Sequence, residues 1–291
     1  MRTLCLGEAL VDLIGERPDA FVPHFGGATS NVAVLAARTG APTALAGGAG
    51  DDAWGRWLLA RLEREHVDVS LFELIGGAQT PLAIVRVDAL GEPRYEIYGE
   101  TIATVVHALA DRLEAAVRDS AALFLGSNTL VGAEEREVTM RARELALAQS
   151  KPVIFDPNLR LHRWRSSAEA AAAANACVPG ALLVRATAAE AELMTGARDP
   201  ERGALELAHA GAALVVITLG PDGAILRGEL EDEAPGVPAD VISTVGAGDA
   251  LTGVLLGRLA LADFDHQAVA EALPEAVEAS ARACERWGAL E

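Results

Sequence analysis

Residues 240–254 read DVISTVGAGDALTGV, and the rest of the chain is interpreted in relation to this stretch. An apolar, strand-like run ends at Ile242, and the small residues Gly246, Ala247 and Gly248 then form a turn. Apolar residues at helical spacing follow the turn, so it leads into a helix. The first N–H groups of such a helix lack partners and are directed at one point, which makes an anion site.

Asp249 falls in the first turn of this predicted helix, beside the anion site. A carboxylate there is explained if the anion is a phosphoryl group and the carboxylate takes a proton from the attacking hydroxyl. The alternative is that Asp249 only caps the helix, as aspartate often does. The four-residue motif alone favours this structural alternative, so the decision rests on the remaining sequence.

The chain has 291 residues, enough for one large α/β domain or for a domain with a small appendage. Its residues are 51% hydrophobic but only 4% aromatic, so the core must be built mainly from Ala, Leu and Val. No apolar run reaches the ~18 residues of a membrane span, and no basic leader with a cleavage site opens the sequence. The three cysteines form neither a metal-binding spacing nor a disulfide framework. The expected location is the cytoplasm.

The formal net charge is −18, and Lys151 is the only lysine in the sequence. Such an acidic surface argues against a nucleic-acid partner, whose phosphates would be repelled. The sequence has no Gly-x-x-x-x-Gly-Lys-Ser/Thr motif, which excludes a Walker-type P-loop. Phosphate binding must therefore use backbone amides, arginine and a metal. The six histidines show no HxH or HExxH spacing, so no zinc site is predicted.

From residue 105 onward, helical and strand-like segments alternate along the chain. This order predicts an α/β fold with a mostly parallel central sheet that is covered by helices on both faces. Ligands bind beyond the carboxyl ends of the strands in open sheets of this kind. Four features are expected to converge there: Asp12, Asp156, Thr218 and the turn at Gly246.

Three strand-like segments, residues 67–74, 82–87 and 94–98, follow one another with hairpin-type turns between them. They stand out because the rest of the chain alternates strand and helix. The pattern predicts a small antiparallel flap. Such a flap serves as a lid over a site or only extends the sheet.

A second glycine turn occupies residues 25–31, with Gly26 and Gly27 leading to Asn31. The glycines let the backbone approach a ligand closely, and the asparagine can both donate and accept hydrogen bonds, which suits the hydroxyls of a polyol. Thr29 or Ser30 is expected to cap a helix that runs from about residue 31 to residue 38. A plain entry from loop to helix explains the segment equally well.

Two other polar residues are candidates for substrate contacts. Asp12 lies inside an apolar stretch, and a side chain facing a pocket is favoured there over one that is hydrogen-bonded in the core. Arg160 follows a strand and a proline-fixed turn, where its fixed donors suit a phosphate or a substrate. An ordinary surface arginine remains the alternative.

Two strand ends carry candidates for nucleotide and metal binding. Thr187 and Glu190 have the spacing of a helix capping box, and Glu190 can also hold Mg²⁺ through water; the two interpretations are compatible. Thr218, Gly220 and Gly223 follow the next strand, and they suit nucleotide phosphate or ribose as well as a tight hairpin turn.

These motifs together resemble the ribokinase-like, or PfkB-type, carbohydrate kinases over nearly the full chain. Residues 26–33 and 50–55 look like the N-terminal signature of that family. Residues 243–250, together with Gly253, look like its C-terminal signature. Two signatures in this order, roughly 200 residues apart, are a specific combination. Residues 7–12 and 155–160 are similar to the fructokinase and 2-keto-3-deoxygluconate kinase branch.

The resemblance implies a single kinase domain over residues 1–291, an α/β sandwich with a small β-lid formed by about residues 10–25 and 70–102. It further implies Mg·ATP as donor and a primary hydroxyl of a sugar as acceptor. The implied roles are: Asp249 as general base; the amides of Gly246, Ala247 and Gly248 as anion hole; Asp12, Gly26, Gly27, Asn31 and Arg160 at the sugar; Thr187, Thr218, Gly220 and Gly223 at the nucleotide; Glu190 near Mg²⁺.

The sequence departs from the family pattern at three places. Ser243 stands where the family usually has Asp near a monovalent-cation site, which leaves potassium activation open. Thr187 replaces the usual Asn of the element near the metal. Residues 99–101 read Gly-Glu-Thr, where many members of the branch carry an arginine after Tyr98. A keto-acid substrate needs that cation, so a neutral sugar such as fructose is favoured.

Other interpretations stay open. Within the fold, the substrate is alternatively 2-keto-3-deoxygluconate, ribose or a nucleoside. A sugar- or nucleotide-binding regulator with little turnover is a second class, against which Asp249 argues. An NAD-dependent dehydrogenase ranks last, because no Gly-x-Gly-x-x-Gly follows the first strand. Exposed strand edges seek partners, so we expect a homodimer that pairs through residues 82–98.

Overall fold

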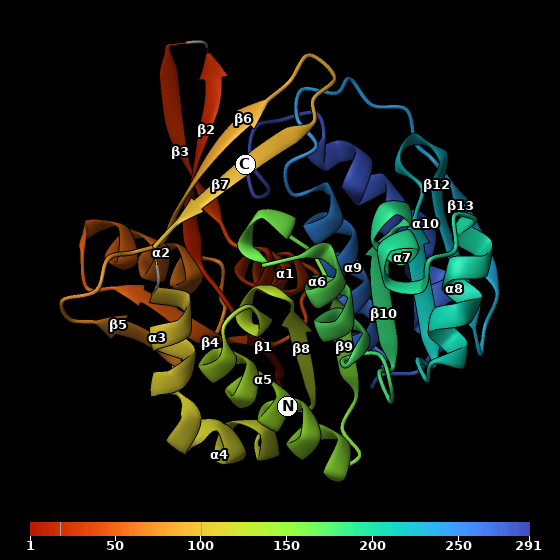
Figure 1. Ribbon diagram of the computed structural model, residues 1–291, viewed down its shortest axis with the longest axis horizontal. Helices are drawn as coiled ribbons and strands as arrows, with labels where there is room; N and C mark the ends of the chain where they lie inside the picture. The colour runs from red at the N-terminus through yellow and green to blue at the C-terminus, as the bar shows by residue number, and fades with distance from the viewer. Residues whose placement is uncertain (18, 100) are drawn as a thin grey trace.

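The computed structural model describes residues 1–17, 19–99 and 101–291. Its centre is a nine-stranded sheet in the order β13-β12-β11-β10-β9-β8-β1-β4-β5, in which β12 runs opposite to the other eight strands and pairs antiparallel with β11 and β13 (Figure 1). The strands are β1 (Thr3–Leu6), β4 (Thr43–Gly50), β5 (Phe72–Ile75), β8 (Ala122–Gly126), β9 (Val153–Asp156), β10 (Leu183–Thr187), β11 (Leu214–Thr218), β12 (Gly223–Gly228) and β13 (Asp232–Pro235). The predicted α/β fold with a mostly parallel sheet is confirmed.

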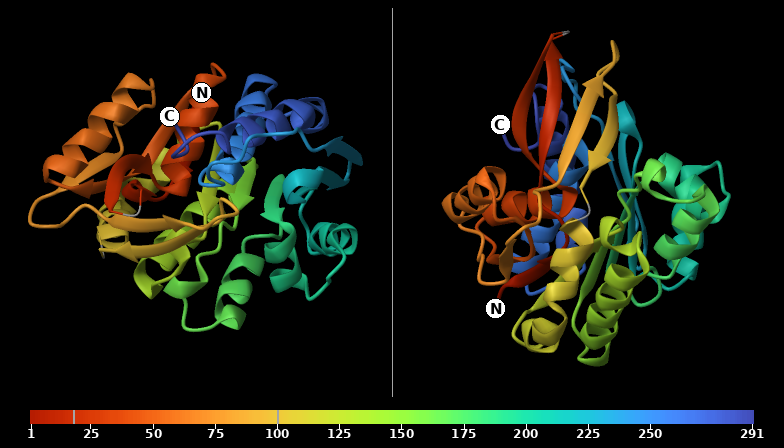
Figure 2. Two further views of the ribbon diagram at one scale, coloured as in Figure 1. Left: turned by 90° about the horizontal axis from the view of Figure 1, so that it is seen from above. Right: turned by 60° about the vertical axis from the view of Figure 1, so that its left-hand side comes forward.

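Helices cover both faces of this sheet, as the edge-on view in Figure 2 shows. One face carries α1 (Ala28–Arg38), α2 (Ala53–Arg64), α9 (Ala247–Leu261) and α10 (Gln267–Ala283). The other carries α3 (Thr101–Ala108), α4 (Leu113–Arg118), α5 (Ala133–Ala148), α6 (Ser167–Asn175), α7 (Ala188–Thr195) and α8 (Pro200–His209). Short 3₁₀ turns lie at Ala110–Arg112, Asn128–Leu130, Leu161–Arg163 and Gly220–Asp222. None of the helices in the described part of the chain is long and apolar enough to cross a membrane.

Alternate residues of the central strands belong to two separate cores. In β8, Phe124 packs in the cluster under α1, α9 and α10, while Leu123 and Leu125 pack in the cluster under α3–α8. Both faces of a parallel strand are thus buried, which is why these strands read as continuous apolar runs rather than as alternating patterns.

A second, four-stranded sheet stands beyond the carboxyl ends of the parallel strands, in the order β3-β2-β6-β7 (Figure 1). It consists of β2 (Leu10–Arg17), β3 (Ala20–Gly26), β6 (Leu82–Val87) and β7 (Pro93–Tyr98). Two hairpins distant in sequence meet in it, because β2 pairs with β6 in parallel. Pro18 and Glu100, which fall within the expected lid, lie outside the described residues.

The expectation that residues 67–74 form a third strand of the flap is wrong. The strand in this region, β5, lies at the edge of the large sheet and pairs in parallel with β4. β4 extends through the glycine run to Gly50, so its end offers a free edge that takes up this segment.

The expected cap of α1 is also wrong. The helix begins at Ala28, with Gly27 as its N-cap and with no side-chain capping bond. The φ of 100° at Gly27 turns the chain directly into the helix, a conformation that glycine adopts without strain. The hydroxyl of Ser30 instead donates to the carbonyl of Gly26, at 2.8 Å, and fastens the preceding turn.

Helices α1 and α9 pack closely because α9 carries glycines on the side that faces α1. A Cβ at Gly253 would collide with the Cβ of Leu35, and one at Gly257 would collide with the hydroxyl of Thr39. This close approach places the N-terminal parts of the two helices side by side, which matters for the site described below.

We expect Gly253→Ala to destabilise the fold by up to about 2 kcal/mol. Alanine gains up to ~1 kcal/mol in helix propensity, but forcing a methyl group into the α1–α9 contact costs roughly 1–3 kcal/mol. Denaturant unfolding gives the free energy of unfolding. Gly76→Ala is the control, because Gly76 is exposed with nothing within 4 Å of its added Cβ, and it should stay within about 0.5 kcal/mol of wild type. Equal effects of the two substitutions would contradict the packing account.

Candidate active site

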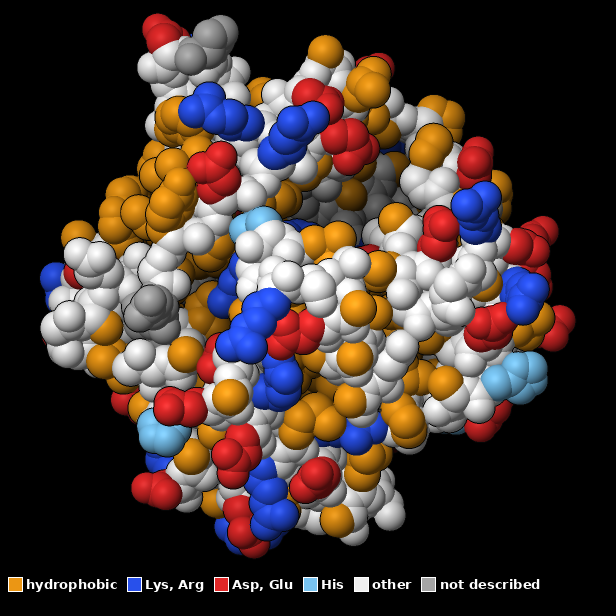
Figure 3. Space-filling model, in the orientation of Figure 1, with side chains coloured by type: hydrophobic (Ala, Val, Ile, Leu, Met, Phe, Trp, Pro, Cys, Tyr) orange, Lys and Arg blue, Asp and Glu red, His pale blue; other side chains and the backbone are white. Residues whose placement is uncertain are grey.

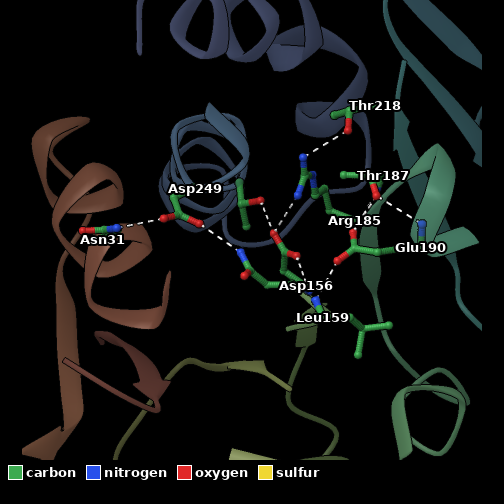
Figure 4. Close-up of polar contacts among 10 residues, drawn as sticks. Asn31, Asp156, Leu159, Arg185, Thr187, Glu190, Thr218 and Asp249 are labelled. Carbon is green, nitrogen blue, oxygen red and sulfur yellow. Dashed lines mark hydrogen bonds and ion pairs between the residues drawn. The ribbon is translucent and has the colours of Figure 1, made fainter. Parts of the chain in front are cut away.

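Asp249 lies at the start of α9, where its carboxylate is buried between two asparagines. Gly246, in the left-handed conformation with a φ of 80°, is the N-cap of the helix. The carboxylate, 7% exposed, accepts from Nδ2 of Asn31 at 2.8 Å and from Nδ2 of Asn158 at 3.2 Å (Figure 4). The hydrogen bonds of this carboxylate therefore go to side chains rather than to the first turn of its helix.

The charges around Asp249 set its acidity. Burial raises the pKa of Asp249 to about 6; the hydrogen bond from Asn31 and the charges of Arg160 and Arg185 oppose this rise, while the charge of Asp156 adds to it. A carboxylate with this pKa is ionised at neutral pH and still takes up a proton readily. That combination suits a general base.

A small polar pocket of about 30 Å³ lies between the second sheet and the large sheet. Its polar lining combines three carboxyl groups, three amides, an arginine and a tyrosine: Glu8, Asp12, Asp249, Asn31, Asn128, Asn158, Arg160 and Tyr95. The amide oxygens of Asn31 and Asn158 are buried and accept no hydrogen bond from the described residues. Buried acceptors of this kind call for donors such as hydroxyl groups. The space admits little more than a water molecule, so a larger ligand requires the two sheets to separate.

Asp12 enters this pocket from the middle of β2, not from a strand end of the large sheet as expected. The reason is that β1 ends at Leu6, and the following apolar run forms a strand of the second sheet. Burial raises the pKa of Asp12 to about 8; Asp249 and Glu8 add to the rise and Arg160 opposes it. A Cβ at Gly26 would collide with the Asp12 carboxylate, so glycine is required opposite it.

Arg160 closes the pocket on another side, and it is not an ordinary surface arginine. Its guanidinium lies 4.5 Å from the ring centre of Tyr95, which belongs to β7 of the second sheet. Its positive charge also acts on Asp12 and Asp249. Arg160 thus joins the segment after β9 to the second sheet.

A larger cleft, of about 1430 Å³, lies next to the small pocket and opens in the upper half of Figure 3. All the predicted nucleotide and metal residues line it: Thr187, Glu190, Thr218, Gly220 and Gly223, with the turn Gly246–Gly248. Its lining also includes apolar side chains: Leu219, Val237, Pro238, Val241 and Val277. Gly246 and Asp249 line both the cleft and the small pocket, so the two spaces meet at the glycine turn.

Glu190 anchors the segment that follows β9. Its carboxylate accepts from the Thr187 amide at 2.9 Å and hydroxyl at 3.0 Å, and from the Leu159 amide at 2.7 Å (Figure 4). The Thr187 hydroxyl also caps the Glu190 amide at 3.1 Å, which confirms the predicted capping box. Across the described residues, no group of three His, Cys, Asp or Glu side chains lies close enough to hold a metal ion.

Arg185 is a residue of the cleft that the sequence interpretation missed. It is 4% exposed; its Nη1 lies 3.3 Å from Oδ2 of Asp156, and its Nη2 donates to the hydroxyl of Thr218 at 3.0 Å (Figure 4). The hydroxyl of Thr252 donates to the same oxygen of Asp156 at 2.7 Å. The available signal was a single charged residue inside the apolar strand β10, two positions before Thr187.

Glu8 and Asn128 were missed as well. The carboxylate of Glu8, 2% exposed, accepts from the hydroxyl of Thr29 at 3.2 Å and from Nδ2 of Asn128 at 2.9 Å. Nη1 of Arg163 donates to Oδ1 of Asn128 at 2.9 Å. An acidic residue two positions after the end of β1, at the carboxyl end of the sheet, was the available signal.

We expect Asp12→Asn to remove part of the pH dependence of stability. The raised pKa means that the folded state holds this proton between about pH 4 and pH 8, where the unfolded state releases it. Stability therefore falls as pH rises through this window, by up to about 1.4 kcal/mol per pH unit for this group. Melting temperatures should show Asp12→Asn gaining on wild type between pH 5 and pH 8. A constant difference across that range would show that Asp12 does not titrate as proposed.

Comparison with known proteins identifies the family. The model of the pfkB family of carbohydrate kinases matches residues 2–291. Fructokinase-1 of Oryza sativa subsp. japonica is 32% identical over 263 residues, which cover 87% of this chain and 81% of that protein. The aminoimidazole riboside kinase of Salmonella typhimurium is 31% identical over 294 residues, covering 98% and 89% of the two chains.

A solved structure supports the same assignment. The fructokinase of Vibrio cholerae O395 with fructose, ADP and calcium ion bound is 28% identical and superposes with a TM-score of 0.85, over 99% of this chain and 94% of that one. The ribokinase-like fold with its small second sheet and the carbohydrate kinase family expected from the sequence are thereby confirmed. The chain belongs to the pfkB family of carbohydrate kinases and is a sugar kinase.

Proposed function

We propose that the enzyme transfers the γ-phosphoryl group of ATP to a primary hydroxyl of a neutral sugar, with fructose as the favoured acceptor. We place this activity in the cytoplasm. The observation that carries this proposal is the position of Asp249. Its buried carboxylate lines both the small polar pocket and the large cleft, next to the Gly246–Gly248 turn. Phosphoryl transfer needs a base where the acceptor meets the donor, and Asp249 lies where the two spaces meet.

The chemistry follows from that position. Asp249 takes the proton of the attacking sugar hydroxyl, and the sugar oxygen bonds to the γ-phosphorus. The bond from that phosphorus to the β,γ-bridging oxygen breaks, and ADP leaves. The amides of Gly246 and Gly248, at the N-terminus of α9, would face the negative charge of the phosphoryl group. The Ala247 amide donates to the Thr244 carbonyl at 3.2 Å, and it would exchange that bond for one to the phosphoryl group.

The sugar is assigned to the small pocket. Asp12 and Asn31, with the backbone at Gly26 and Gly27, would bind its hydroxyls, and Arg160 would hold it from the second sheet. The unpaired amide oxygens of Asn31 and Asn158 support a ligand rich in hydroxyl groups. Three carboxyl groups against one arginine in this pocket disfavour an acidic sugar such as 2-keto-3-deoxygluconate.

The nucleotide is assigned to the large cleft, with Thr187, Thr218, Gly220 and Gly223 along its phosphate side. Gly220 has a φ of 62° and open space around it, so the backbone is accessible to a ligand there. Mg²⁺ would neutralise charge on the donor phosphates. The oxygens of Glu190 already accept three hydrogen bonds, which fits contact with the ion through water rather than direct ligation.

The main test is turnover with Mg·ATP on fructose, 2-keto-3-deoxygluconate, ribose, aminoimidazole riboside and adenosine, with and without potassium. We expect fructose to be phosphorylated best. We also expect little dependence on potassium, because Ser243 offers a buried neutral hydroxyl that already accepts from the Val245 amide. Sugar binding without turnover on any acceptor would instead favour a regulator. Preference for the riboside would move the assignment to a nucleoside kinase.

We expect Asp249→Asn to lower kcat by 10²–10⁴-fold, the usual range for loss of a general base. For wild type, kcat/KM should fall as pH drops below about 6, because Asp249 is then protonated. Asp240→Asn, at an exposed position in the loop before Ser243, is the control and should retain full activity. Activity that survives intact in Asp249→Asn would remove this residue from the mechanism.

We further propose a homodimer that pairs through the second sheet. Large hydrophobic side chains are exposed on that sheet at Phe21 and Tyr98, which are 42% and 54% exposed. Light scattering at micromolar concentration should give twice the mass of 30.2 kDa. Phe21→Ser combined with Tyr98→Ser should shift the mass toward the monomer, whereas a monomeric wild type would exclude the dimer.

A further inference from the structure

Arg185 places a positive charge at the cleft, and its contacts within the protein leave some of its N–H donors unpaired. The guanidinium has five N–H donors. One bond to Asp156 and one to Thr218 are formed, while Nε is buried and has no partner among the described residues. Three donors thus remain on a side chain that is 5% exposed and lines the cleft. Buried donors are normally paired, so unused ones indicate a missing acceptor.

The guanidinium also lies directly against the glycine turn. A Cβ at Gly248 would lie 2.7 Å from Nη1 and 2.9 Å from Nη2 of Arg185. Any larger residue at position 248 would displace the arginine, which explains why the turn ends with a glycine. The N-terminus of α9 contributes partial positive charge at the same place, so two sources of positive charge meet at one point.

The surrounding charges account for only part of this arrangement. Asp156 neutralises one unit of positive charge, and its carboxylate is also satisfied by Thr252 and by the amide of Asn158 at 3.1 Å. If Arg185 served only to neutralise Asp156, a second anchor on Thr218 and contact with Gly248 would not be needed. Thr218 instead holds the guanidinium at the end of β11, on the nucleotide side of the cleft.

We propose that Arg185 is a phosphate-binding residue of the donor site: its free N–H groups bind the terminal phosphates of the nucleotide beside the Gly246–Gly248 turn. This inference rests on the proposed function, since it presupposes a nucleoside triphosphate in the large cleft. The positively charged contact with the phosphates then comes from β10, in a chain that has a single lysine and no P-loop. A guanidinium fits phosphate oxygens in a two-pronged geometry that an ammonium group does not reproduce.

The test compares ligands that differ only in their phosphates. Calorimetric titration of the full chain with a non-hydrolysable ATP analogue and with adenosine separates the phosphate contact from binding of the base. For Arg185→Gln we expect affinity for the analogue to fall 10-fold or more and affinity for adenosine to stay within 2-fold of wild type. KM for ATP should rise while KM for the sugar changes little. Arg185→Lys should recover only part of the loss.

A double variant distinguishes phosphate binding from a merely structural ion pair. Arg185→Gln leaves the carboxylate of Asp156 buried without its cation, and adding Asp156→Asn removes that charge as well. If Arg185 binds phosphate, the double variant stays as weak toward the analogue as Arg185→Gln, while its melting temperature recovers. Recovery of both properties, or an unchanged affinity in Arg185→Gln, would overturn the inference. Wild type that binds no ATP analogue at all would instead overturn the proposed donor, a different outcome.

Discussion

The contact between Asp249 and Asn31 organises the site, because it joins segments that are 218 residues apart. It exists only because α1 and α9 approach closely, which the glycines at 253 and 257 permit. The first turn of each helix then lies at the carboxyl edge of the sheet, where the asparagine of one meets the carboxylate of the other. A shift of α9 by the width of a methyl group would separate the pair. Core packing and catalytic geometry are therefore the same constraint in this protein.

Burying several charges in one place is costly unless they are paired. Here acids and arginines alternate through the site: Asp12, Arg160, Asp249, Arg185 and Asp156 act on one another through space or by direct contact. Burial raises the pKa of all three aspartates, and the arginines limit the rise. The pKa values of the two pocket aspartates therefore differ, so that Asp249 is ionised at neutral pH while Asp12 keeps its proton.

The fold could be predicted from the sequence because its signals are local. Buried parallel strands appear as apolar runs. The strand-like run expected before the Gly246 turn is wrong, because residues 236–246 form no strand and the side chains of Val241 and Ile242 are exposed. The glycine motif predicted the N-terminus of α9, and the spacing of Thr187 and Glu190 predicted a capping box that the structure contains. Residues 67–74 were assigned to the wrong sheet because a strand pattern does not state its partner. Pairing depends on which edge is free once the chain has folded.

Arg185 and Glu8 escaped prediction for a related reason. Each is a single charged residue whose partners lie elsewhere in the sequence: Asp156 and Thr218 for the arginine, Thr29 and Asn128 for the glutamate. Periodicity and local motifs carry no information about such contacts. These contacts form only where several strand ends meet in the folded chain, so the sequence does not predict the polar network of the site.

The tip of the β6–β7 hairpin shows how far the second sheet reaches. The carbonyl of Gly91 accepts from the Thr244 amide at 2.8 Å, and Gly91 packs against Val241, so the hairpin touches the loop that leads into the Gly246 turn. The same hairpin supplies Tyr95 to the small pocket. One element thus contacts the proposed acceptor site through its strands and the approach to the anion site through its tip. Because the small pocket must widen to admit a sugar, movement of this hairpin would be transmitted to the residues just before the glycine turn.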